Sequence, residues 1–123
     1  MKKVFFTLIA ALAFTASSFA QTTVSTVSET EFRDLQNENI YIFVLPANIT
    51  SDDVALMADE FEGRMEAEFN AQTSTCKLIL DAGHITYREH VQRFLVGLGM
   101  EEVRMDGNTL SLKDFSDTYV LNR

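Results

Sequence analysis

IYIFVLPANITSDDVALMADEFEG, residues 40–63, joins a predicted strand to a predicted helix and decides the fold of this chain. Residues 40–45 are a continuous run of β-branched, aromatic and aliphatic side chains that stops at Pro46, which is typical of a central strand buried on both faces. Thr50 and Asp53 have the spacing of a capping box, and apolar residues recur after them at helical spacing. Gly63 is the natural end of this segment, because glycine readily takes the left-handed conformation that ends helices.

Changes in the spacing of apolar residues predict the secondary-structure elements after Gly63. Residues 64–69 alternate between charged and apolar side chains, which indicates a half-exposed strand. Residues 76–80 alternate again and predict a strand with Cys76 on its inward face. An apolar stripe over residues 91–98 predicts a second helix, and residues 101–105 predict a further strand.

The resulting order over residues 40–105 is β-α-β-β-α-β, the order of a ferredoxin-like α+β fold. In that fold two helices cover one face of a four-stranded antiparallel sheet. We expect this domain to span residues 39–107. Residues 21–38 are predicted to be a flexible leader with a short helix, and residues 108–123 an extension that continues as a strand or a helix.

The outline of residues 39–107 resembles the heavy-metal-associated domain of copper chaperones and metal-pumping ATPases. The resemblance rests on a hydrophobic strand, a capped helix, two strands and a second helix ending in FLVGLGMEEV, residues 94–103. That family binds soft metals through a Met-x-Cys-x-x-Cys loop, because two thiolates at this spacing clamp Cu(I). Here the corresponding loop, residues 45–51, reads LPANITS and holds no sulfur ligand. The resemblance therefore implies the fold without the metal site or any cofactor.

The first twenty residues have the three parts of a secretory signal peptide. Lys2 and Lys3 form the charged region, residues 4–14 the apolar region, and residues 18–20 a small-x-small cleavage site. The apolar run is too short to cross a bilayer as a helix, which takes about 20 residues. We therefore expect an exported protein, periplasmic or secreted, with no stable membrane insertion once residues 1–20 are removed.

Composition limits the partners of the predicted mature chain, residues 21–123. It has eight Lys and Arg residues and 18 carboxylates, which gives a formal charge of −10. Nucleic-acid binding needs clustered basic residues, so this class of partner is excluded. The carboxylates concentrate between Asp52 and Glu68, where a solvated acidic surface is the favoured interpretation and a basic partner or Ca²⁺ the alternative.

No pattern in the sequence predicts catalysis, so we expect a protein that is not an enzyme. Asp81, His84 and His90 could supply metal ligands, but their spacing matches no established site and polarity around a loop is favoured. Cys76 is the one cysteine, which excludes an intramolecular disulfide. As an unpaired cysteine on an apolar strand it is predicted to be a core residue, with a reactive thiol, a metal ligand or an intermolecular bridge as the alternatives.

The residues predicted to contact a partner are Tyr41, Phe43 and Ile79, placed on the sheet face turned away from the helices. Charged residues would surround them as a polar rim: Arg64, Glu66, Glu68, Lys77 and Arg104. This face would serve as a site for another protein, an apolar ligand or a second copy. The open alternative is that the terminal segments cover it, with Phe32, Leu35, Phe115 and Tyr119 as the covering side chains.

The function expected from the sequence is therefore an exported, non-enzymatic binding module that acts through its sheet face or by self-association. The alternative is a protein of the cell envelope that binds a metal ion or a small ligand.

Overall fold

The computed structural model describes residues 21–81 and 85–121. The predicted signal peptide, residues 1–20, and His84 lie outside the described residues. The elements in chain order are β1 (Thr23–Thr26), α2 (Glu29–Gln36), β2 (Ile40–Val44), α3 (Ser51–Asp59), β3 (Met65–Asn70), β4 (Thr75–Leu80), α4 (Ile85–Gly97), β5 (Glu102–Met105), β6 (Asn108–Ser111), α5 (Leu112–Phe115) and the π-helical turn η1 (Ser116–Val120).

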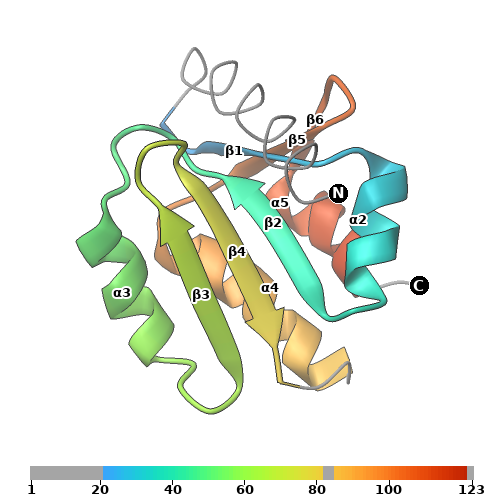
Figure 1. Ribbon diagram of the computed structural model, residues 1–123. Helices are drawn as coiled ribbons and strands as arrows, with labels where there is room; N and C mark the ends of the chain where they lie inside the picture. Colours follow the sequence, from blue (N-terminus) through green and yellow to red (C-terminus); the bar gives the residue numbers. More distant parts are fainter. Residues whose placement is uncertain (1–20, 82–84, 122–123) are drawn as a thin grey trace.

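The six described strands form one mixed sheet in the order β3-β4-β2-β1-β5-β6 (Figure 1). The predicted α+β class is confirmed, and β2 to β5 follow the predicted β-α-β-β-α-β order. The prediction of a four-stranded antiparallel sheet is wrong. β1 lies between β2 and β5, antiparallel to β2 and parallel to β5, and β6 extends the sheet beyond β5.

β1 lies within residues 21–38, so the prediction that this stretch is a flexible leader is wrong for Thr23–Thr26. Its sequence, TVST, shows no clean alternation of apolar and polar residues, yet all four side chains are buried. Thr and Val are β-branched and favour extended backbone, which was the available signal. The hydroxyl of Thr26 donates to the carbonyl oxygen of Ile42 at 2.7 Å, so a polar side chain is satisfied inside the sheet.

The helices of the described part pack on one face of the sheet, as Figure 1 shows for α4 and α5 behind the strands. The ring of Phe32 in α2 lies 5.6 Å from that of Tyr41 in β2, and Phe115 in α5 lies 6.1 Å from Phe43. α4 contacts both α3 and η1, which places these elements in the same layer. The large aromatic side chains of the core therefore lie between the sheet and this helical layer, whereas Ile42 and Val44 are buried on the other face of the sheet.

Local sequence signals fix several element ends as predicted. Ser28 accepts a hydrogen bond from the backbone N–H of Glu31 at the start of α2, and Thr50 and Asp53 form the complete capping box of α3. Asp106 and Gly107 have positive φ angles of 51° and 81°, which matches the tight turn of the β5–β6 hairpin. The extension after this turn, left open between strand and helix, contains both, because β6 is followed by α5.

The C-terminal turn is held by donors from α2. The Nε2 atom of Gln36 donates to the carbonyl oxygens of Tyr119 at 2.9 Å and Val120 at 3.2 Å. The guanidinium of Arg33 donates to the carbonyl of Tyr119 at 3.0 Å and lies 5.2 Å from the centre of its ring. Carbonyls at a helix end have no partner within the helix, so these side chains replace the missing donors.

Candidate binding groove at the edge strand β3

Two of the three residues predicted to contact a partner are buried under the helices. Tyr41 is 1% exposed and Phe43 is 0% exposed. Their rings contact Phe32 and Phe115, so segments near both ends of the chain cover them. The placement of Tyr41 and Phe43 on the face turned away from the helices is therefore wrong, and the alternative of terminal cover describes their surroundings.

The third residue, Ile79, lies on the opposite face and is half-buried. The register explains the separation, because Tyr41 and Phe43 pair with Leu78 and Cys76 across β2 and β4. Residues directly opposite one another in a ladder point to the same face, whereas neighbours along one strand point to opposite faces. The structure therefore does not bring Ile79 together with Tyr41 and Phe43.

Cys76 is a packed core residue, as its alternation in the sequence predicted. It is unpaired and 1% exposed. Burial raises the pKa of its thiol to about 12, because the thiolate would lose its hydration. The reactive form of cysteine is the thiolate, so the folded protein suppresses the chemistry of this group.

His90 is buried against two rings and does not face a cluster of ligands. Its ring lies 5.2 Å from that of Phe61 and 5.5 Å from that of Tyr87, and its Nδ1 atom has no hydrogen-bond partner. Burial, and then the positive charges of Arg64 and Arg93, lower the pKa of His90, while Glu89 opposes them. Within residues 21–81 and 85–121, no group of three His, Cys, Asp or Glu residues is placed to hold a metal ion.

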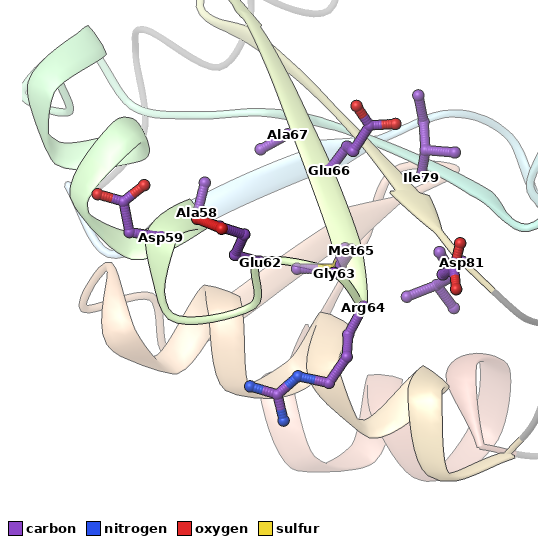
Figure 2. Close-up of a pocket in the computed structure, with 11 residues that line it drawn as sticks. Ala58, Asp59, Glu62, Gly63, Arg64, Met65, Glu66, Ala67, Ile79 and Asp81 are labelled. Carbon is purple, nitrogen blue, oxygen red and sulfur yellow. The ribbon is translucent and has the colours of Figure 1, made fainter.

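A groove of about 560 Å³ lies at the start of β3. Figure 2 shows Ala58 and Asp59 of α3 on one side of β3, and Ile79 of β4 and Asp81, just after β4, on the other. The groove is lined by residues of α3, the turn after it, β3 and β4: Ala58, Asp59, Glu62, Gly63, Arg64, Met65, Glu66, Ala67, Ile79, Leu80 and Asp81.

The groove carries an excess of negative charge. Four of the lining residues named above are acidic and one, Arg64, is basic. Arg64 donates to the carbonyl oxygen of Glu60 at 2.8 Å and lies 6.0 Å from the ring of Phe61, so its charge is directed away from Glu66 (Figure 2). Part of the acidic run in the sequence is therefore brought together around the start of β3.

The backbone along the outer side of β3 is the second component of the groove. β3 is an edge strand whose neighbour among the described strands is β4. The N–H of Asp81 donates to the carbonyl of Arg64, so this carbonyl and the backbone groups of residues 66, 68 and 70 point to β4. Those of residues 65, 67 and 69 point outward. The N–H of Met65 turns back to the carbonyl of Phe61, which leaves the N–H groups of Ala67 and Phe69 facing outward from the sheet.

A second, smaller groove of about 300 Å³ lies between α3 and the end of α4. Met57 of α3 packs against Gly97 there, where the absence of a side chain lets the helices approach closely. Leu56 lines this groove and is 70% exposed. It contributes apolar surface but no outward-facing strand backbone.

The sequence predicted strand 64–69 as half-exposed, but it could not show that this strand ends the sheet. The alternation of Glu66 and Glu68 with Ala67 and Phe69 is the signal that marks the strand. Its position at an edge follows from pairings between residues far apart in the chain. None of the helices in the described part is long and apolar enough to cross a membrane.

Comparison with protein-family models, with curated proteins and with solved structures found no match.

Proposed function

We propose that this chain is an exported, non-enzymatic binding protein of the cell envelope that engages another protein through the open edge of its sheet at β3. The observation that carries the proposal is the edge of β3, where two backbone N–H groups face outward next to a groove with an acidic lining. Unpaired strand edges are templates for pairing with another chain. We propose this edge as the binding surface in place of the sheet face predicted around Tyr41 and Phe43.

Export is supported by the sequence of residues 1–20, and a cationic partner by the formal charge of the whole chain, −8. A negative field attracts basic surfaces and repels nucleic acid. The alternative, binding of a metal ion or small ligand, has less support, because His90 is enclosed by rings and lacks other ligands nearby among the described residues.

Site-specific photo-crosslinking in the producing cell tests the proposal. A photoreactive amino acid is placed at position 66 on β3 and, as a control, at position 109 on β6. Both positions are exposed, and β6 is the opposite edge of the sheet. We expect a discrete crosslinked product from position 66 and none from position 109. Equal products from both positions, or none from position 66, would contradict binding at the β3 edge.

A further inference from the structure

We infer that β3 pairs with an extended segment of another protein in which every second side chain is Lys or Arg. The inference rests on the proposed function and adds the chemistry of the partner. β3 is six residues long, so the paired segment spans five or six residues and about 20 Å.

The main-chain contacts come from alternate residues of β3. Ala67 and Phe69 present outward N–H groups, and the carbonyls of residues 65, 67 and 69 point the same way. An incoming strand in register with these groups would satisfy them by ladder hydrogen bonds. This is strand addition to a sheet edge, in which backbone bonds supply affinity and alternate side chains supply specificity.

The side chains of β3 divide the incoming strand into two faces. Glu66 and Glu68 are exposed on the face turned away from the helices, whereas Ala67 and Phe69 are half-buried on the helical face. Opposite-charge pairs directly across a ladder are favourable, so residues opposite the two glutamates are basic. Residues opposite Ala67 lie beside Ala58 of α3 and are small or apolar.

Glu66 is the stronger determinant of the two glutamates. Glu68 pairs across the ladder with Lys77, which already supplies a positive charge, whereas Glu66 pairs with Ile79. Of the other acidic residues of the groove, Asp81 lies on the same side of β3 as Ile79, whereas Asp59 lies on the α3 side. A basic side chain opposite Glu66 therefore meets a carboxylate that no basic cross-strand neighbour offsets.

A second copy of this chain is a poor occupant of the same edge. A two-fold axis between two antiparallel β3 strands pairs residue 66 with residue 66, 68 or 70 of the other copy, because paired residues share a face. Each of the first two registers sets carboxylate against carboxylate, which is destabilising. The remaining register pairs Glu68 with itself. The glutamates therefore disfavour self-pairing and select a basic strand.

Peptide titration of the isotope-labelled mature protein tests the inference. The probe is a six-residue peptide with the pattern Thr-Lys-Val-Lys-Val-Thr, compared with a peptide of the same composition in which the lysines are adjacent and one in which Glu replaces Lys. We expect the alternating basic peptide to bind at least tenfold more tightly than the other two. Amide shifts are expected at residues 65–69, and the N–H groups of Ala67 and Phe69 should gain protection from hydrogen exchange.

Two matched pairs of variants separate the contribution of side-chain charge to binding from that of backbone hydrogen bonds. Glu66→Lys should weaken binding at least tenfold, whereas Glu101→Lys, an exposed charge outside the groove, should not. Ala67→Pro removes an outward N–H without breaking the β3–β4 ladder and should abolish binding. Thr109→Pro makes the same change on the outer side of β6 and should leave binding unchanged. Circular dichroism checks that each variant is folded.

Equal affinity for the three peptides, or shifts centred away from residues 65–69, overturns the inference without use of any variant. If crosslinking from position 66 succeeds while the basic peptide does not bind, the chemistry assigned to the partner is wrong and the proposed function stands. If the peptide binds at β3 but no crosslink forms in the cell, the recognition chemistry stands and the proposed cellular role is wrong.

Discussion

Truncation of Phe43 to alanine should severely destabilise the protein, because its ring is fully buried between the sheet and α5. Phe43 is 0% exposed and its ring lies 6.1 Å from that of Phe115. Replacement of a buried Phe by Ala costs about 3–5 kcal/mol, through lost burial and the cavity that remains. Domains of this size have a free energy of unfolding of about 5–15 kcal/mol, so the variant loses much of its stability.

Urea unfolding followed by far-ultraviolet circular dichroism measures this loss. With a urea dependence of about 1.5 kcal/mol per molar, within the usual range, the midpoint should fall by about 2–3 M. Ile79→Ala is the control, because Ile79 is half-buried on the opposite face, and its midpoint should fall by less than half as much. Equal losses in the two variants would refute the assignment of Phe43 to the helical face. A Phe43→Ala protein that keeps its stability and loses only the binding of a partner would also refute this assignment.

Three further expectations concern buried polar groups. Gln36→Leu should lower the free energy of unfolding by about 2–3 kcal/mol, since it removes buried hydrogen bonds to the carbonyls of Tyr119 and Val120; an unchanged urea midpoint would show that these bonds do not hold the C-terminal turn. Cys76 should react with a thiol reagent at pH 8 only at the rate of unfolding, because its pKa is about 12 in the fold, and immediate labelling of native protein would contradict this. The lowered pKa of His90 means that the unfolded chain binds its proton first, so stability is full above the ordinary value of 6.5 and falls as the pH drops below it. His90→Gln should therefore flatten stability between pH 7 and 5, and an equally steep loss in the variant would exclude His90 as its source.

Signals confined to a few neighbouring residues were read correctly from the sequence. The capping box at Thr50 and Asp53 needs only four consecutive residues in the first turn of a helix, and the Asp106-Gly107 turn needs only two adjacent residues of positive φ. Their geometry is nearly independent of the rest of the fold. The same holds for the alternation in β3, which gave a half-exposed strand at the correct place.

Features that depend on distant pairings were not accessible in this way. The run from Ile40 to Val44 is apolar throughout. Without alternating polar residues, the sequence does not show whether Tyr41 or Ile42 points to the helical face. The face to which each side chain points is set by the register against β4, in which Tyr41 lies opposite Leu78. β1 poses the same problem, because its place between β2 and β5 is fixed by partners whose nearest residues along the chain are more than ten positions away.

The insertion of β1 also explains why the edges of this sheet differ in character. β1 separates β2 from β5, and β6 extends the far side, so the two edges are the six-residue β3 and the four-residue β6. Edge strands are commonly protected from aggregation by shortness or by charge. β6, with the sequence NTLS, is short and uncharged, whereas β3 is longer and carries two glutamates. Protection alone would be served by Lys or Glu in equal measure, since either charge repels a like strand. Asp59, Glu62 and Asp81 add further negative charge around the same strand, which Arg64 offsets only in part. Protection of the edge does not need this excess of negative charge, whereas recognition of a basic strand does.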